Sequence, residues 1–329
     1  MKDKLQRGPL SRKAFIDWLT REGRARYHDR HPFHILMHEG RLVKPQLQQW
    51  VLNRYYYQTR IPIKDALILS KSEDPAFRRM WLRRIQDHDG RREGDGGLAS
   101  WLNLATGVGL DPEEVRSCRS VLPGVRRACD SYVEFVREST LLEAVASSLT
   151  ELFAPDLMTR RLQAWKRHYP WVRAGALGYF RRRVSLASLD SSQAIDFVVG
   201  YATTYEWQEK CAHALIKKTD ILWQMLDCIE AAYARAPAGK PRLSSKARIR
   251  VDRRSGRSML LYPEAGLDLN HTATEIMRMC TGEHTVKDIA ERMARLYNKV
   301  PSAEIERDVK IFLSTLEHRR LLQIVDDER

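Results

Sequence analysis

The sequence predicts an all-α helical bundle that is followed by a small α+β domain. From about residue 11 to residue 234, apolar residues recur with the period of a helix. Residues 235–247 lose this period and gather Pro, Gly and Ser, as linkers do. The pattern after them alternates, as in β-strands. We therefore expect a helical domain over residues 1–236, a linker over 237–247 and a second domain over 248–329.

Helix-start signals divide the first region into separate helices. Pro45 opens one helix, and Asp74 with Pro75 starts another, because the first turn of a helix tolerates proline. Further helices are expected over residues 123–139, 141–153, 156–168, 178–189 and, as the longest, about 193–234. The longest carries a seam with spacings of three and four, typical of helix bundles, formed by Cys211, Leu215, Lys218, Leu222, Met225 and Ile229.

The last region is expected to combine a β-hairpin with three short helices. Residues 247–263 alternate around a Ser-Gly turn. Thr285 and Ser302 are suitable N-caps for two of the helices. The expected elements are helices near residues 271–280, 285–297 and 302–318 and a final strand over 321–325.

The composition restricts the class of protein without choosing a function. Lys and Arg number 56 against 42 Asp and Glu, a surplus that suits nucleic acid, anionic lipid, a polyanionic small molecule or simply a basic surface. No apolar run approaches the roughly 18 residues that span a bilayer, and the N-terminus lacks the apolar region of a secretory signal. The five Cys form no CxxC pair, so we expect reduced thiols in a cytoplasmic protein without membrane contact.

Polar side chains occupy helix faces that are otherwise apolar. Arg54 and Gln58 share one stripe with Leu47 and Val51, and Lys218 is a member of the seam. Inward positions of the same kind hold Lys64, His88, Tyr179 and Arg183.

Several inward cations require anionic partners, because an unpaired buried charge is costly. Asp65 and Glu151 are too few to neutralise these cations together. We therefore infer a pocket for a multiply anionic small molecule. The alternatives are ordinary internal ion pairs and side chains that reach water at helix ends. His88 has a further alternative, since a His near a helix C-terminus also complements the helix dipole.

Other constellations point away from metal and nucleotide chemistry. Four His residues crowd the segment YHDRHPFHILMHEG, but its proline interrupts the helix that would align them as ligands. No Glu-x-x-His occurs, which disfavours a ferritin-like di-iron site, and there is no G-x-S-x-G. The glycines of EGDGG follow a helix and lack the Lys-Ser/Thr of a P-loop. We expect no metal.

These features occur in segments that resemble a known family. YHDRHPFH, NRYYYQTRIPIKDA, RIQDHDG, EGDGG, SSLTELFAP and HYPW resemble the PqqC family, pyrroloquinoline-quinone synthase, and they extend over nearly all of residues 11–234. Residues 246–329 resemble PqqD through LLYPEAGLDLN and TATEIMRMCTGEHTVKDIA. The chain is thus similar to a fusion of PqqC with PqqD.

The resemblance implies a haem-oxygenase-like bundle without haem, followed by a winged-helix-like domain. It also implies the final step of pyrroloquinoline quinone synthesis, which is ring closure and eight-electron oxidation of a quinoline tricarboxylate precursor. Molecular oxygen would be the oxidant and hydrogen peroxide a product, with no metal or organic cofactor. Such an anionic substrate would account for the inward cations.

The resemblance also implies roles for individual residues. His88 would be a general acid/base, and Tyr179 and Arg183 would lie beside oxygen, where a cation stabilises developing negative charge. His28 would belong to the same catalytic set. The substrate site would be lined by Arg54, Tyr57, Gln58, Lys64, Thr150, Glu151, Arg161 and Lys218. Met158 departs from the family, whose members often place a His in the oxygen pocket, and Met donates no proton.

The PqqD-like region would bind the precursor peptide PqqA and present it to the radical-SAM enzyme PqqE. A hairpin edge accepts an extended peptide by β-augmentation. The alternative partner is nucleic acid, because a stripe of basic residues is an electrostatic footprint for phosphate. That stripe comprises Lys246, Arg248, Arg250, Arg253, Arg254 and Arg257. We favour the peptide, and a homodimer is a further expectation.

Two other functions compete with the oxidase. A thiaminase-like hydrolase of the same bundle type needs a nucleophilic Cys beside a carboxylate, whereas Cys211 and Glu209 belong to different helix faces. A non-catalytic helical sensor with a DNA-binding tail would use the basic hairpin and would need no active site. We favour the oxidase over both.

Overall fold

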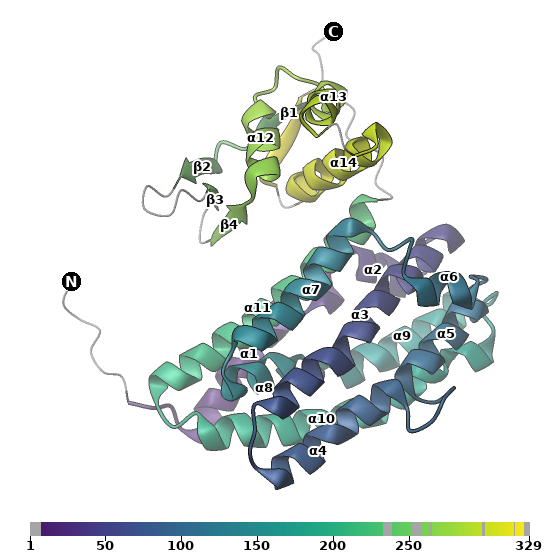
Figure 1. Cartoon of the computed structure of the whole chain (residues 1–329), viewed down its shortest axis with the longest axis vertical. Coiled ribbons are helices and arrows are strands. Elements are labelled where there is room, and N and C mark those ends of the chain that lie inside the picture. The colour runs from purple at the N-terminus through teal and green to yellow at the C-terminus, as the bar shows by residue number, and fades with distance from the viewer. Residues whose placement is uncertain are drawn as a thin grey trace. The chain divides into compact units, whose positions relative to one another are not determined.

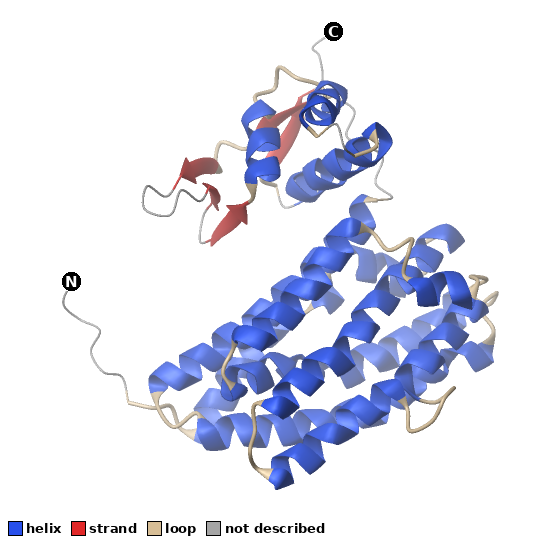
Figure 2. Cartoon of the chain, in the orientation of Figure 1, coloured by secondary structure: helices blue, strands red, loops and turns tan. Residues whose placement is uncertain are grey.

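The computed structural model describes residues 8–232, 239–251, 258–262, 265–297, 300–318 and 320–325. The chain forms two compact units, residues 1–226 and 227–329. Figures 1 and 2 show helices in the first unit and both helices and strands in the second. The expected boundary at residue 236 lies outside the described residues.

The first unit is built of α-helices joined by short turns. They are α1 (Arg12–Arg26), α2 (Pro32–His38), α3 (Lys44–Ser70), α4 (Pro75–Asp89), α5 (Gly96–Gly107), α6 (Pro112–Ser117), α7 (Pro123–Glu138), α8 (Leu141–Ser147), α9 (Ala154–His168), α10 (Gly178–Tyr201) and α11 (Tyr205–Ala231), which crosses the division between the units. Three 3₁₀ turns lie between them: η1 (His28–Arg30), η2 (Ser148–Phe153) and η3 (Ala174–Leu177).

The helix starts expected at Pro45 and at Asp74 with Pro75 are confirmed, whereas α10 runs from Gly178 to Tyr201 across the start expected near residue 193. Pro45 lies in the first turn of α3, and Pro75 is the first residue of α4. Asp74 caps α4, because its side chain accepts hydrogen bonds from the backbone N–H groups of Ala76, at 2.8 Å, and Phe77, at 3.3 Å. These signals are local, so the sequence alone was sufficient to place them.

Helix α3 is the central element of the bundle, since it packs against α4, α5 and α7, as Figure 1 shows. An aromatic cluster joins α3 to α5, α9 and α10. Trp50 lies 5.4 Å from Trp101 and 5.9 Å from Trp165, and Trp165 lies 5.2 Å from Phe180, measured between ring centroids. All four side chains are less than 2% exposed. This apolar core fixes the helices whose polar residues form the site.

The expected single helix over 193–234 is wrong, because the chain ends α10 at Tyr201 and begins α11 at Tyr205. Ala202 leaves helical geometry with ψ 68°, and the Thr204 hydroxyl accepts a hydrogen bond from the N–H of Trp207 at 3.3 Å. A Thr before an apolar period is thus an N-cap here. The predicted seam is confirmed, because its six residues all lie on α11 and are buried.

The second unit contains five strands and three helices among its described residues. They are β1 (Lys240–Leu243), β2 (Arg248–Val251), β3 (Ser258–Tyr262), β4 (Ala265–Leu269), α12 (His271–Met279), α13 (Val286–Leu296), α14 (Ser302–His318) and β5 (Leu322–Val325). Strands β2, β3 and β4 form one antiparallel sheet, and β1 pairs with β5 in another. Leu260, Ile289 and Leu313 are fully buried in its core.

Most expectations for the second unit are confirmed. Strands β2 and β3 form the expected hairpin, whose turn lies outside the described residues. Thr285 caps α13 in a capping box with Asp288. Strands β1 and β4 were not expected, and β1 lies inside the range that we predicted as linker. Four residues with a Pro carry too little alternation to indicate a strand, and the partner of β1 is far away in the sequence.

None of the described helices combines the length and the apolarity that crossing a bilayer requires.

Candidate active site

Cationic side chains gather inside the helical unit. They are Arg54 and Lys64 of α3, Arg84 of α4, Arg161 of α9, Arg183 of α10 and Lys218 of α11, and none is more than 7% exposed. The four cations that we expected to point inward therefore do so. Their immediate partners divide them into two groups, which we call the paired group and the unpaired group.

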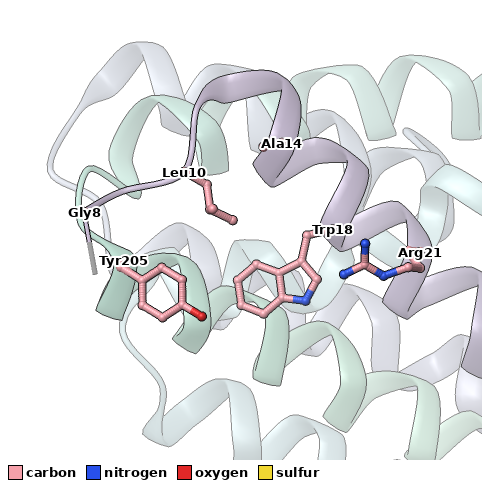
Figure 3. Close-up of a pocket in the computed structure, with 6 residues that line it drawn as sticks. All are labelled: Gly8, Leu10, Ala14, Trp18, Arg21 and Tyr205. Atoms are coloured by element: carbon pink, nitrogen blue, oxygen red, sulfur yellow. The ribbon is translucent and has the colours of Figure 1, made fainter. Parts of the chain in front are cut away.

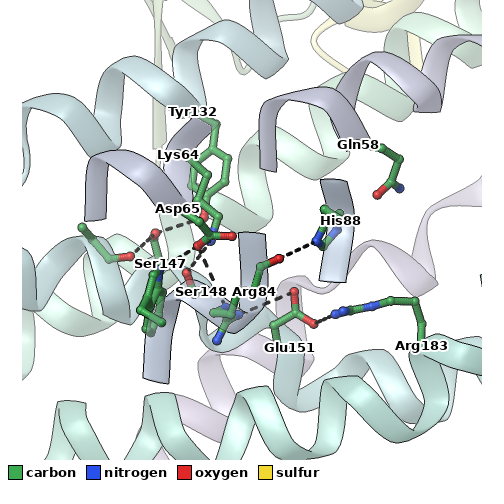
Figure 4. A network of polar contacts seen from close by, with 12 residues as sticks. Gln58, Lys64, Asp65, Arg84, His88, Tyr132, Ser147, Ser148, Glu151 and Arg183 are labelled. Atoms are coloured by element: carbon green, nitrogen blue, oxygen red, sulfur yellow. Dashed lines mark hydrogen bonds and ion pairs between the residues drawn. The ribbon is translucent and has the colours of Figure 1, made fainter. Parts of the chain in front are cut away.

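The paired group consists of Lys64, Arg84 and Arg183 with the carboxylates of Asp65 and Glu151 (Figure 4). Lys64 Nζ lies 2.6 Å from Asp65 Oδ1. Arg84 reaches both acids, at 3.9 Å from Asp65 and 4.0 Å from Glu151, and Arg183 donates a hydrogen bond to Glu151. The group thus joins α3, α4, η2 and α10 through ion pairs.

Neutral donors and acceptors complete the paired group. Trp81 Nε1 donates to Asp65 Oδ1 at 2.9 Å, and Lys64 Nζ donates to Ser148 Oγ at 3.0 Å. Asp65 Oδ2 is buried without a hydrogen-bond partner in the described part of the chain. Burial opposes ionisation of Glu151, but the charges of Arg183, Arg84 and Lys64 outweigh it and lower the pKa of this carboxyl to about 2.

The sequence prediction did not include Arg84. This residue continues the stripe of Phe77, Trp81 and His88, with spacings of four, three and four, so the signal was present in the sequence. Its side chain is 5% exposed. The guanidinium lies 4.4 Å from the Trp81 ring, which holds it in place between the two acids.

The unpaired group consists of Arg54, Arg161 and Lys218. Arg54 lies 4.0 Å from the ring of Tyr57. Arg161 lies 4.8 Å from the ring of Trp50. Within the described residues no carboxylate forms an ion pair with any of the three, and both Lys218 Nζ and Arg161 Nε are buried without a hydrogen-bond partner.

Burial changes the proton affinity of the unpaired group. It lowers the pKa of Lys218 well below the usual range, and the nearby charges of Lys64 and Arg54 add to the effect. Burial, followed by the charge of Arg54, lowers the pKa of Arg161 to about 9. A buried ion without a partner costs several kcal/mol, whereas stacking on an aromatic ring contributes only about 0.5 to 2 kcal/mol. These cations are therefore poorly compensated.

His28 and His34 lie beside Arg161. The Nδ1–H of His34 donates to the backbone oxygen of His28 at 2.9 Å, so its Nε2 is the acceptor for Arg161 Nη2 at 3.2 Å. Burial lowers the pKa of both imidazoles well below the ordinary value, with further lowering by Arg54 and Arg161 at His28 and by Arg161 at His34. Both rings are consequently neutral at pH 7.

His88 is held at the end of α4 in one tautomer. Its Nδ1–H donates to the backbone oxygen of Arg84 at 3.2 Å, which leaves Nε2 with a lone pair. Burial and then the charge of Arg183 lower the imidazole pKa to about 4. Gly96, at φ +84°, packs against this helix end, where a Cβ would lie 2.6 Å from the His88 backbone oxygen. The glycine cluster therefore holds the histidine in position.

Tyr179 extends the site toward the aromatic core. Its hydroxyl donates to Gln58 Oε1 at 2.9 Å, and its ring lies 4.7 Å from that of Trp101. Burial raises the pKa of Tyr179, so the phenol keeps its proton. Thr150 and Met158 are buried as well, each 7% exposed.

The residues predicted to form the site come from seven elements of one unit. They are His28 of η1, Arg54, Tyr57, Gln58 and Lys64 of α3, His88 of α4, Thr150 and Glu151 of η2, Arg161 of α9, Tyr179 and Arg183 of α10 and Lys218 of α11. All are buried except Glu151, which is half-buried. The arrangement can bind several carboxylates and supplies neutral imidazoles as proton acceptors.

The described part of the chain has no cluster of metal-ligating side chains, and its Cys211 thiol is not activated as a nucleophile. No three His, Cys, Asp or Glu side chains are grouped there as metal ligands would be. Burial raises the pKa of the Cys211 thiol to about 12, so this thiol is protonated at pH 7.

A separate pocket of about 620 Å³ lies at the start of α1 and α11 (Figure 3). Trp18 and Tyr205 form its aromatic wall, with nearly parallel rings, and Arg21 lies at one end. None of the predicted site residues lines it, so it is distinct from the charged interior.

Comparison with known proteins identifies the family. The model of the TENA/THI-4/PQQC family matches residues 17–228. The chain belongs to this family. Residues 257–322 match the model described as coenzyme PQQ synthesis protein D. The PqqC-like and PqqD-like regions that we expected are therefore confirmed.

Curated members of the family cover one or both regions. The chain is 37% identical to a "Bifunctional coenzyme PQQ synthesis protein C/D" of Methylorubrum extorquens, over 92% of each chain. It is 50% identical to a "Pyrroloquinoline-quinone synthase" of Rhizobium meliloti, which covers 69% of this chain and 90% of the relative. The second relative thus matches about two thirds of this chain and the first nearly all of it.

Solved structures identify the fold. A domain from Shewanella denitrificans described as having a heme oxygenase-like fold superimposes with TM-score 0.56 at 13% identity, covering 68% of this chain and 94% of that one. A TenA homologue from Pseudomonas syringae gives TM-score 0.54 at 13% identity and covers 69% and 98%. The helical region therefore has the haem-oxygenase-like fold that we expected.

Proposed function

We propose that the helical unit is a pyrroloquinoline-quinone synthase, which closes the last ring of a quinoline tricarboxylate precursor and oxidises it with O2. The unpaired group supports this proposal most directly. Arg54, Arg161 and Lys218 are buried without a carboxylate partner among the described residues, and a tricarboxylate supplies one carboxylate for each. The names of two relatives support the synthesis of pyrroloquinoline quinone.

In this proposal the paired group and the imidazoles manage charge and protons. His88 is neutral, and its Nε2 accepts a proton from the substrate. Arg183 stabilises negative charge on oxygen as it is reduced, and Tyr179 donates a hydrogen bond there once its hydroxyl turns away from Gln58. Each two-electron oxidation moves two electrons and two protons from the substrate to one O2, which leaves as H2O2. We propose that no metal or organic cofactor takes part.

For the second unit we propose binding of the precursor peptide PqqA and delivery to the radical-SAM enzyme PqqE. Among the described strands β2 lies at an edge of its sheet and pairs with β3 alone, so its other side can pair with an extended peptide. Lys246, Arg248 and Arg250 are exposed along this edge. These cations also suit nucleic acid, and a titration must separate the two partners.

Aerobic incubation of chelator-treated protein with the quinoline precursor tests the oxidase. Appearance of the quinone absorbance together with peroxide is expected, and no turnover in air would refute the proposal.

For the second unit, the full chain is titrated with PqqA and with duplex DNA at two salt concentrations. Salt-sensitive DNA binding without peptide binding would reassign this unit. Light scattering of the same samples measures the expected homodimer.

A further inference from the structure

Among the described residues of the interior, Lys218 is a basic side chain with neither a carboxylate nor a hydrogen-bond acceptor to stabilise its charge. Its side chain is 1% exposed and lies on the apolar seam of α11 between Leu215 and Leu222. Nζ has no hydrogen-bond partner in the part of the chain that the structure describes. It faces the ring of Tyr132 at 3.3 Å and that of Tyr57 at 4.2 Å. Ring faces attract a cation but cannot replace the hydrogen bonds of its lost water.

The groups around Lys218 add positive charge. Those facing it are Arg54, Tyr57 and Lys64 from α3, Cys129 and Tyr132 from α7 and the more distant Glu151 from η2. Lys64 is engaged with Asp65 and Ser148, and Glu151 with Arg183. Among the described residues, neither Asp65 nor Glu151 is therefore free to pair with Lys218.

The positive charge of this cluster decreases if the Lys218 ammonium loses its proton. A guanidinium holds its proton far more strongly than an ammonium does, and Arg161, with a pKa of about 9, is still cationic at pH 7. Lys64 has a carboxylate partner at 2.6 Å. Lys218 has neither a guanidinium nor a carboxylate partner among the described residues, and burial together with Lys64 and Arg54 depresses the pKa of its ammonium.

We propose that Lys218 is an uncharged amine in the ligand-free protein and takes up a proton as the carboxylates of the ligand arrive. The lysine is then a proton-linked binding residue, and ligand affinity falls as the pH rises. The first half of this inference, that the amine is uncharged in the ligand-free protein, is independent of the proposed function. The second half, that the amine takes up a proton when the ligand binds, rests on that function.

Unfolding of ligand-free protein between pH 7.5 and 9.5 tests the first half. Wild type is compared with Lys218→Met, which suits the apolar seam, and with Lys217→Met, which alters the exposed neighbour. A lysine that is neutral when folded but charged when unfolded makes folding more favourable as the pH rises. The ratio of the unfolding constants of wild type and Lys218→Met should therefore fall roughly tenfold per pH unit. A ratio that is constant with pH, as expected for Lys217→Met, would overturn the inference.

Anaerobic calorimetry tests the second half, with pyrroloquinoline quinone as the probe in buffers of different ionisation enthalpy. Wild type and Lys217→Met should take up about one proton more on binding than Lys218→Met, because one lysine supplies the site. Equal uptake by all three proteins would overturn the proton-linked role. A wild type that binds no quinone would refute the proposed function and this second half together, while the unfolding experiment still decides the first.

Discussion

The paired and unpaired groups use the same residue types in one helical interior but bury their charges in different ways. In the paired group three cations share Asp65 and Glu151, and Trp81 and Ser148 satisfy further polar atoms. In the unpaired group the basic side chains rest on aromatic rings, and Arg161 and Lys218 each leave a donor without a partner among the described residues. The first arrangement gives each of its cations a carboxylate, whereas the second has no carboxylate partner among the described residues. Stability should therefore depend on the paired group, and affinity on the unpaired group.

The largest effect is expected at His88, which adjoins the paired group through Arg183. His88→Gln keeps a hydrogen-bonding side chain but removes the proton acceptor. General acid–base catalysis typically contributes 10²–10⁴-fold, so turnover should fall by about that factor with little change in KM. Steady-state kinetics with the quinoline precursor measures this split. A variant with normal kcat would show that His88 only caps its helix.

The same histidine predicts a pH dependence of stability. Its pKa of about 4 in the folded state lies below the unfolded value of about 6.5. The unfolded chain binds its proton first, so acidification from pH 6.5 toward pH 4 destabilises the folded protein. One such group contributes roughly 1.4 kcal/mol per pH unit in this window. The free energy of unfolding, measured by denaturation at a series of pH values, should fall less steeply on acidification in His88→Gln than in wild type, by that amount per pH unit.

The next effect is expected at the buried ion pair of Lys64 with Asp65 in the paired group. Asp65→Asn leaves Lys64 buried without its carboxylate, and removal of one partner of a buried pair costs about 3–5 kcal/mol. Urea denaturation should register this loss. Asp196→Asn is the matched control, because it breaks an exposed pair with Arg12 that is worth about 0–1 kcal/mol. Similar losses in both variants would remove the distinction between buried and surface pairs.

The smallest effect lies on the unpaired side. Arg54→Met should leave stability unchanged or raise it, because an uncompensated buried charge is replaced by an apolar side chain. Ligand affinity should fall about ten- to hundredfold, as expected for a hydrogen bond to a charged group. Anaerobic titration with pyrroloquinoline quinone measures it, and exposed Arg83→Met is the control. If Arg54→Met loses stability and keeps affinity, the two groups have been assigned in reverse.

Patterns within one helix were predictable, whereas partners across helices were not. The stripe of Arg54 and the seam of Lys218 indicated inward cations from spacing alone. The engagement of Asp65 and Glu151 with only some of those cations depends on how four elements pack, which spacing does not encode. The break at Ala202 was missed because the apolar period runs on across it. Strand β1 was missed because its partner is more than seventy residues away.

The pairing of β1 with β5 links the first strand of the small unit to its last. Four consecutive residue pairs, from Lys240 opposite Val325 to Leu243 opposite Leu322, bring its entry and its exit together. Such a unit closes on itself and needs only one covalent connection to whatever precedes it. Encoding the two regions as separate genes or as one gene would therefore leave this closure intact, which makes fusion and fission of the two regions structurally simple steps.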